Sequence, residues 1–508
     1  MVLSRSRLVA PALAVALALV AILTHAQGVD VAAATYRVGL FARSGLTLWD
    51  SQWYGGHWTF NYSVIFAPIG WLTGIPLMEI FCVAVAAWAF DRLAVARFGR
   101  SGRIAALFFA AGTIVQVSIG QEPYLLGETI GLVALVAAHA RHWRLAMVLA
   151  VACALASPLT GGFMALAALA WMVGVWPEHR WALVGLAAAA TIPVGVLELL
   201  FPGQGMMPFA TLNFIGMTLG CLALGVVVAL RRDRALTTGI ALYAAALVFT
   251  YAVPSAIGAN ITRLGISFGV ALVVALAGES RRGRALLVAA AVPIALAQWV
   301  PALGPLTGQF SPSMRAAYFS PLLSFLHRTD RPLGRVEVVP TAFHWEAAYV
   351  APEFPLARGW ERQLDTANNS LFYVAGKLTA GSYRTWLFTN GVRFVALPDV
   401  ALDYAAKAEA RLVRHGVPGL TLVWHSAHWR VYSVTGAPGI VSGPARLVSE
   451  DGAQVVLTAT HPGSIVVRER YVPAWRVTQG KASVSAARGG WLRVRVNRPG
   501  RVELRIAL

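Results

Sequence analysis

Charged side chains are scarce in this sequence. Only 13% of its 508 residues are Asp, Glu, Lys or Arg, whereas a typical soluble domain has about 25%. Because 57% of the residues are hydrophobic, the composition excludes an ordinary soluble protein and indicates a multi-pass membrane chain. Lysine is absent from residues 1–301, which hold 18 Arg and 10 acidic residues. Residues 302–508 hold 24 Lys and Arg and 13 acidic residues, the mixture expected of a soluble domain.

Cysteine is also rare, and several motifs are missing. The three cysteines, Cys82, Cys153 and Cys221, lie in apolar segments, which excludes a disulfide framework or a CxxC metal site in the soluble part. The sequence has no glycine-rich phosphate loop, no GxSxG and no Ser-His-Asp order typical of a hydrolase. It has no dense Lys/Arg run either, so the net charge of +19 does not indicate a nucleic-acid partner.

Eleven apolar runs predict about eleven membrane spans, at residues 8–26, 63–90, 104–119, 124–140, 145–157, 160–176, 181–200, 211–230, 235–252, 264–278 and 284–301. A spanning helix needs about 20 apolar residues, so short runs such as 145–157 leave the count open by one or two. The first run follows Arg5 and Arg7 and favours an uncleaved span over a signal peptide, because it is slightly long for a signal and many spans follow.

Arginines alternate between the loops. Fifteen lie in loops of one side: Arg5, Arg7, Arg92, Arg97, Arg100, Arg103, Arg141, Arg144, Arg180, Arg231, Arg232, Arg234, Arg281, Arg282 and Arg284. The opposite loops hold three, Arg37, Arg43 and Arg263. By the positive-inside rule the N-terminus is cytoplasmic and the chain after Pro301 is extracytoplasmic, which predicts a multi-pass plasma-membrane protein.

Three regions follow from these patterns. Residues 1–301 are predicted to form the transmembrane domain, with an outer first loop at 27–62, and 302–440 a mixed α/β region. Strands are expected in GRVEVVP and GVRFVALPD, a short helix in FHWEAAYVAPEF and a hairpin in LTLVWHSAHWRVYSV. Residues 441–508 have period-two patterns in AQVVLTAT, GSIVVRERY, WLRVRVN and GRVELRIAL, which predict a β-sandwich.

The first outer loop contains the stretch LTLWDSQWYGGHWTFNYS, which is unusually polar and aromatic. Asp50 can act as a general base for a hydroxyl group, or it can cap a short helix. Gly55 and Gly56 permit a tight turn that brings His57 close to Asp50. Gln52, Trp53 and Tyr54 are candidates for sugar binding, while an aromatic belt at the membrane interface explains most of the aromatic residues equally well.

Three more candidates for substrate binding lie in later outer loops. Arg263 can form a bidentate contact with a lipid-linked phosphate, or it can contact ordinary phospholipid heads. Asn260 lies beside it, and Glu122 could supply a carboxylate to a divalent metal, although a hard-cation site needs more oxygens than these loops offer. No metal site is therefore predicted, and His425 with His428 lacks a third ligand for zinc. His344-Trp345-Glu346, Trp360-Glu361-Arg362 and Asp365 form a further polar-aromatic group.

The first-loop stretch LWDSQWYGGHWTFNYSVIFAPIGWLTG resembles the first outer loop of GT-C type membrane glycosyltransferases. It is more similar still to the YfhO-like and 6-pyruvoyl-tetrahydropterin synthase-related group of bacterial membrane proteins, in which W-[ND]-x-x-W/F-x-G-G precedes the second span. GVRFVALPD with LVWHSAHWRVYSV, and YVPAWRVTQG with NRPGRVELRI, are similar to that group's outer-domain patterns. The loop holds Asp50 alone where GT-C loops commonly have an acidic pair.

The resemblance implies a GT-C-like fold and an inverting transfer of sugar from a polyprenyl-phosphate donor to a cell-envelope glycan or glycolipid. No cofactor is predicted, since the sequence does not support a divalent metal. The resemblance assigns Asp50 as the first-loop acid, with His57 beside it as our second candidate for catalysis. Two other functions stay open: a transporter or lipid-carrier flippase, and a non-catalytic scaffold of the cell envelope. A transporter would place ionisable groups near the middle of the bilayer, whereas here they gather toward the outer side.

Overall fold

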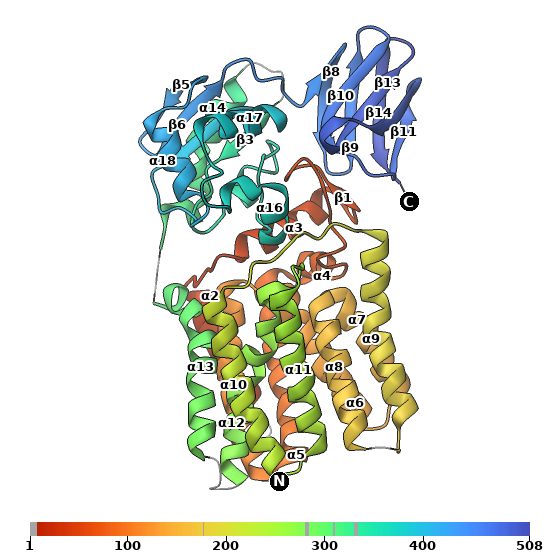
Figure 1. Ribbon diagram of the computed structural model, residues 1–508, viewed down its shortest axis with the longest axis vertical. Coiled ribbons are helices and arrows are strands. Elements are labelled where there is room, and N and C mark those ends of the chain that lie inside the picture. The colour runs from red at the N-terminus through yellow and green to blue at the C-terminus, as the bar shows by residue number, and fades with distance from the viewer. Residues whose placement is uncertain (1–7, 176, 280–283, 308–309, 330–333, 508) are drawn as a thin grey trace. The chain divides into compact units, whose positions relative to one another are not determined.

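The computed structural model describes residues 8–175, 177–279, 284–307, 310–329 and 334–507 (Figure 1). The chain forms two compact units, which we call the helical unit (Met1–Ala34 and Phe60–Gln309) and the mixed unit (Thr35–Thr59 and Phe310–Leu508). The sequence predicted contiguous regions divided at residue 301. The structure instead groups residues 35–59, from the predicted first outer loop, with the C-terminal part of the chain.

The helical unit is a bundle of apolar helices. They are α2 (Val9–Leu23), α4 (Phe66–Thr73), α5 (Ile75–Ile119), α6 (Glu122–His139), α7 (Trp143–Ala156), α8 (Pro158–Gly174), α9 (Arg180–Leu200), α10 (Thr211–Leu230), α11 (Arg234–Ala252), α12 (Thr262–Glu279) and α13 (Arg284–Leu306). Among the described residues, six helices are long and apolar enough to cross a membrane, and α2, α7 and α8 are shorter apolar helices. These helices indicate a membrane-embedded protein.

Helix α5 contains two antiparallel arms. Gly99 has φ 57° and ψ −124°, which breaks the helix, and the ring of Phe90 stacks on that of Phe109 at 4.4 Å across the turn. The arms match the end of the predicted run 63–90 and the run 104–119. Run 63–90 itself is interrupted at Gly74, whose φ of 77° separates α4 from α5. The total of eleven spans and their orientation stay predictions.

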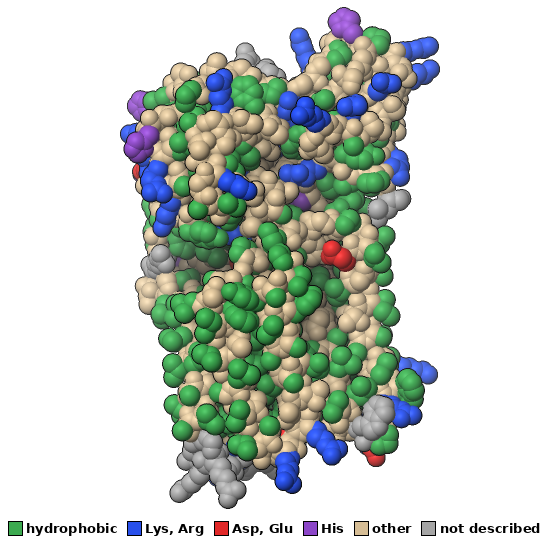
Figure 2. All heavy atoms as spheres, viewed as in Figure 1, with side chains coloured by type: hydrophobic (Ala, Val, Ile, Leu, Met, Phe, Trp, Pro, Cys, Tyr) green, Lys and Arg blue, Asp and Glu red, His purple; other side chains and the backbone are tan. Residues whose placement is uncertain are grey.

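In α2, small residues face the inside of the bundle, whereas Leu19, Val20 and Leu23 are exposed. The buried residues of α2 are Ala10, Ala14, Ala18 and Ala21, spaced to share one face of the helix, which packs on α5. Such alanine faces let helices approach closely where no hydrophobic effect drives them together. Figure 2 shows hydrophobic side chains over the visible face of this bundle, with Lys and Arg at the lower end of the view. Arg5, Arg7, Arg281 and Arg282 lie outside the described residues.

The mixed unit contains a four-stranded sheet with helices on both faces. Its strands, β3 (Arg335–Val338), β4 (Val392–Pro398), β5 (Leu420–His425) and β6 (Trp429–Val434), lie in the order β3-β4-β6-β5, with only β3 and β4 parallel. Helices α17 (Ala380–Thr389) and α18 (Lys407–His415) pack on one face through Leu387 and Val413. On the other, Phe319 of α14 (Ala316–Arg328) contacts Trp429. The predicted strands, the hairpin and the short helix α15 (Glu346–Tyr349) are confirmed.

The C-terminal part of the mixed unit is a β-sandwich, as predicted (Figure 1). One sheet has the order β12-β13-β10-β7 and the other β11-β14-β9-β8. The bounds are β7 (Val441–Ser442), β8 (Ala445–Asp451), β9 (Gln454–Ala459), β10 (Gly463–Arg470), β11 (Trp475–Gln479), β12 (Ala482–Ala486), β13 (Trp491–Val496) and β14 (Gly500–Ile506). The four strands expected from period-two patterns are β9, β10, β13 and β14. Their buried alternate residues, among them Leu457, Val467, Leu492 and Leu504, form the core.

Residues 35–59 lie inside the mixed unit. After helix α3 (Val31–Ser44), which the sequence did not predict, the chain forms a hairpin of β1 (Trp49–Asp50) and β2 (His57–Trp58). The backbone N–H of Leu356 donates to the Gln52 carbonyl at 2.8 Å, and that of Arg470 donates to the Gly55 carbonyl at 2.7 Å. The hairpin is therefore hydrogen-bonded both to the chain around the four-stranded sheet and to the sandwich.

A substitution at Gly56 would test how tightly this hairpin is enclosed. Its φ is +105°, and a Cβ added there would lie 2.3 Å from the Trp49 ring. We expect Gly56→Ala to lower the free energy of unfolding of the mixed unit by about 3 kcal/mol, because backbone strain and overpacking act together. Denaturant unfolding of the full chain, followed by tryptophan fluorescence, measures this change.

Gly381 in α17 provides the control. A Cβ added there meets nothing within 4 Å, so Gly381→Ala should be neutral or stabilise the protein by up to about 1 kcal/mol through helix propensity. Equal effects of the two substitutions would contradict the enclosure of the hairpin.

Candidate functional site

The β1–β2 hairpin positions Asp50 opposite His57. Tyr54, Gly55 and Gly56 have consecutive positive φ values of 60°, 71° and 105°, and this turn pairs the two residues across the hairpin. Asp50 Oδ2 lies 4.0 Å from His57 Nδ1, which is contact but not a hydrogen bond. The predicted effect of the glycine pair is confirmed.

The carboxylate of Asp50 is fully enclosed and hydrogen-bonded. The Tyr36 hydroxyl donates to its Oδ2 at 2.9 Å, and the Gln52 backbone N–H donates to its Oδ1 at 3.1 Å. Asp50 is 0% exposed, so no substrate group reaches it in this conformation. The bond to Gln52 makes an Asx turn, so Asp50 caps a turn of the loop and not a helix.

Burial sets the protonation of both residues. It raises the pKa of Asp50 to about 6, against the opposing effect of the hydrogen bonds from Gln52 and Tyr36. Burial, aided by the nearby Arg37, lowers the pKa of His57 to about 3, so its imidazole is neutral at physiological pH. A neutral His57 forms no ion pair with Asp50, and such a weak base is poorly matched to proton abstraction near pH 7. The catalytic roles of these two residues stay predictions.

The loop residues predicted to bind substrate are packed in the same place. Trp53 is 0% exposed and stacks on Tyr36 at 4.2 Å between ring centroids and on His57 at 5.6 Å. The Tyr54 hydroxyl donates to the Glu361 carbonyl at 3.1 Å and accepts from the Glu361 N–H at 2.9 Å. Gln52 Nε2 donates to the Glu450 carbonyl at 3.3 Å. These contacts show that the aromatic residues pack in the interior of the mixed unit. From the sequence we expected sugar binding or an aromatic belt, and not interior packing.

The other three candidates lie in the helical unit. Glu122 is the buried first residue of α6, Asn260 lies in the 3-10 helix Gly258–Ile261, and Arg263 lies in the first turn of α12. Arg263 Nη2 approaches Asp30 Oδ2 at 3.9 Å, and its guanidinium lies over the Tyr124 ring at 5.5 Å. The Arg263 and Asp30 side chains are 20% and 27% exposed, so this pair is accessible whereas Asp50 is not.

A polar network extends from this pair into the bundle. The hydroxyls of Tyr124 and Ser267 are 3.2 Å apart, and Gln116 Nε2 donates to the Ser267 hydroxyl at 3.0 Å and to Glu128 Oε2 at 2.7 Å. All four side chains are buried. Polar groups inside a membrane domain are costly, so this network is a candidate functional site. The sequence did not single out Gln116, Tyr124 or Ser267, because neither apolar runs nor loop charge distinguish them from residues that only fill the bundle.

The predicted site residues thus form two groups. Asp50, Gln52, Trp53, Tyr54 and His57 gather in the mixed unit, and Glu122, Asn260 and Arg263 belong to the helical unit. The residues therefore divide between the two units, and no single site within either unit contains all eight.

The remaining polar-aromatic group forms an internal network of the mixed unit. His344 stacks on Trp360 at 3.5 Å and lies 3.3 Å from carboxylate oxygens of Glu346 and Asp403, while Arg362 pairs with Asp403 at 2.7 Å. The bonds to the two carboxylates outweigh burial and raise the pKa of His344. The group is internally paired, which indicates a structural role.

No metal centre is evident in the described part of the chain, where no cluster of three His, Cys, Asp or Glu residues could hold an ion. The cysteines Cys82, Cys153 and Cys221 are free and buried. His428 Nδ1 lies 2.9 Å from Asp399 Oδ2, which gives this histidine a carboxylate partner.

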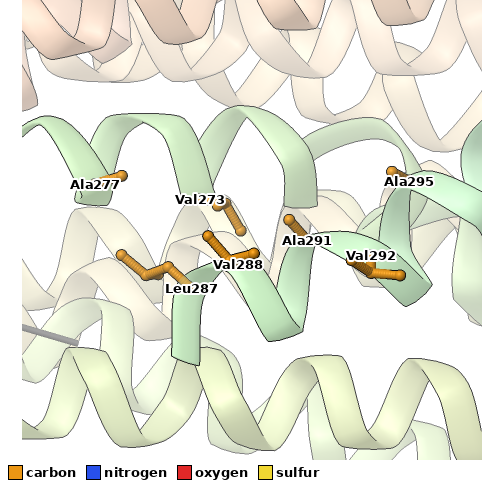
Figure 3. Close-up of a pocket in the computed structure, with 7 residues that line it drawn as sticks. All are labelled: Val273, Ala277, Leu287, Val288, Ala291, Val292 and Ala295. Atoms are coloured by element: carbon orange, nitrogen blue, oxygen red, sulfur yellow. The ribbon is translucent and has the colours of Figure 1, made fainter. Parts of the chain in front are cut away.

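An apolar cavity of about 300 Å³ lies between α12 and α13 (Figure 3). Its lining residues are Val273, Ala277, Leu287, Val288, Ala291, Val292 and Ala295. Val273 lies ten residues beyond Arg263 on α12, about 15 Å along the helix axis, so the cavity is separate from the Arg263 site. Its wall offers no group that could orient a polar substrate.

Comparisons with protein-family models and with curated proteins find no match to this chain. The function is therefore argued from the two sites themselves.

Asp50 makes stability depend on pH. Because its folded pKa of about 6 exceeds the ordinary 3.8, the folded state holds the proton more tightly, and stability falls as pH rises from about 4 to about 6. The full loss is about 3 kcal/mol. Asp50→Asn should remove this part of the pH profile, measured by denaturant unfolding across pH 4 to 7.

Asp399→Asn is the matched control. The hydrogen bonds of Asp399 to His428 and Tyr318 outweigh burial and lower its pKa, so its contribution is lost as pH falls. A wild-type profile that Asp50→Asn leaves unchanged would show that Asp50 does not titrate in this range.

Proposed function

We propose that this chain is a GT-C-like membrane glycosyltransferase that transfers a sugar from a polyprenyl-phosphate donor to a cell-envelope acceptor. The single observation that supports this is the accessible Arg263–Asp30 pair, joined through Tyr124 to a buried polar network at one end of the helical unit. An arginine with a partly exposed guanidinium suits the phosphate of a lipid-linked donor.

The proposed reaction uses the pair as base and phosphate ligand. The acceptor hydroxyl oxygen forms a bond to the anomeric carbon while the bond from that carbon to the phosphate oxygen breaks, with inversion. Asp30 takes the hydroxyl proton, and Arg263 stabilises the charge that develops on the departing lipid phosphate. The atoms balance without a redox partner.

Asp30 replaces Asp50 as the proposed base. Asp50 is 0% exposed and both of its oxygens accept hydrogen bonds, whereas the Asp30 side chain is 27% exposed. The alternation of loop arginines supports placing this chemistry on the outer face of the plasma membrane.

A transporter or lipid-carrier flippase is the second candidate. Glu128 supports it, because this carboxyl lies inside the bundle, two turns into α6, and bonds Gln116. Ionisable groups within spans mark substrate or ion paths in many transporters.

Two substitutions test the transferase. We expect Asp30→Asn and Arg263→Gln each to lower transfer by at least about 100-fold, since each removes a group needed only as the bond breaks. The polyprenyl-phosphate sugar should accumulate in membranes that express either variant at wild-type level. Lipid-carrier and glycan analysis by mass spectrometry measures both quantities.

Asp50→Asn and Glu198→Gln are the controls. Asp50→Asn should keep transfer in proportion to the amount of folded protein, and Glu198, which bonds Gln204, should be dispensable. If folded Asp50→Asn lost transfer while Asp30→Asn stayed active, the base would be Asp50 and not Asp30. Unchanged glycans in every variant would reject the transferase in favour of a transporter or scaffold.

A further inference from the structure

The two sheets of the sandwich have different outer faces. In β13 the residues alternate between buried Leu492, Val494 and Val496 and exposed Arg493 and Arg495. Arg495 is paired in register with Ser464 on one side and Ser483 on the other, and Arg493 with Val466 and Ser485. We call these six residues the arginine face. It carries two guanidinium groups, three hydroxyl groups and one small apolar side chain.

No acidic side chain neutralises this surface. Residues 441–508 contain 11 Lys and Arg and 4 acidic residues. Two of the acids, Glu450 and Glu469, are enclosed with Arg335, and Glu503 pairs with arginines of the opposite sheet. The fourth, Asp451, ends β8 of that opposite sheet. No ion pair among the described residues includes Arg493 or Arg495. Figure 2 shows Lys and Arg side chains gathered over the sandwich, with no acidic side chain visible in that part of the view.

The opposite sheet has arginines that are already paired. Arg505 bonds Glu503 at 3.0 Å and Gln454 at 3.0 Å, and Arg501 lies 3.9 Å from Glu503. These two arginines are also exposed, so they differ from Arg493 and Arg495 in pairing and not in residue type. The contrast indicates that charge on the arginine face is left available for an external partner.

We propose that the arginine face binds a linear phosphate-bearing polymer. Arginines two residues apart on one strand project about 7 Å apart on the same side of the sheet, which suits successive phosphates of a chain. Guanidinium groups bind phosphate bidentately, and the serine hydroxyls can donate to phosphate or polyol oxygens between them. The exposed face of the sheet can bind an extended chain without a cavity. This proposal does not depend on the transferase function, since the face lies wholly within the sandwich.

Binding to long-chain inorganic polyphosphate tests the proposal. The full chain in nanodiscs of neutral lipid is titrated with labelled polyphosphate, and affinity is measured by fluorescence anisotropy at several salt concentrations. We expect Arg493→Gln with Arg495→Gln to weaken binding at least tenfold and to flatten the dependence on salt, because two phosphate contacts are lost.

The matched control is Arg501→Gln with Arg505→Gln, which removes the same charge from the opposite sheet. It should change affinity less than twofold. Equal weakening by both double variants would overturn the proposal, because only net charge would then matter. Absence of polyphosphate binding by the wild type would also overturn it.

Binding to anionic vesicles distinguishes a polymer partner from a lipid surface. Phosphatidylglycerol vesicles, titrated against the chain in neutral-lipid nanodiscs, should bind the arginine-face variant and wild type alike. Loss of vesicle binding with polyphosphate binding unchanged would make the partner a membrane surface and overturn the polymer. Thermal unfolding of each double variant, expected to match wild type because all four arginines are exposed, shows that the sandwich is intact.

Discussion

The mixed unit depends on a buried electrostatic connection between its sheets and the loop that enters it. Arg335 of β3 is enclosed and reaches Glu450 at 3.5 Å and Glu469 on the sandwich, while it also donates to the Asn390 carbonyl at 3.1 Å. A buried guanidinium without partners would cost several kcal/mol, so the four-stranded sheet and the sandwich must keep these distances. The hairpin of residues 49–58 lies against the same groups and adds backbone hydrogen bonds to both.

This arrangement explains why a loop between two apolar runs is so polar and aromatic. Trp49, Trp53 and Tyr54 are buried in a unit most of whose residues come more than 250 positions later in the chain. Their side chains add buried apolar area to the 199-residue C-terminal segment of this unit. The loop therefore ties the first helices of the chain to the folding of the mixed unit.

Asp30 and Asp50 lie twenty positions apart in the chain, and their different surroundings give the two carboxyl groups different properties. Asp50 is shielded, hydrogen-bonded by Tyr36 and Gln52, and its pKa rises to about 6 because burial disfavours the charge. Asp30 stays partly exposed, with its Oδ2 3.9 Å from Arg263 Nη2. An accessible carboxylate beside a cation can exchange protons with a substrate, whereas an enclosed one mainly sets stability.

The sequence by itself determined the apolar bundle, the strands with strong period-two or continuous apolar patterns, and the tight turn at Gly55 and Gly56. Those features are local, because a hydrophobic pattern and the backbone conformation of a glycine depend only on residues close together in the sequence. It did not determine that residues 35–59 fold with the C-terminal part, that Arg263 faces Asp30, or that Gln116, Tyr124 and Ser267 join one network. Only the tertiary structure decided these, because burial and pairing join residues far apart in the chain, and a single sequence carries no local signal for such contacts.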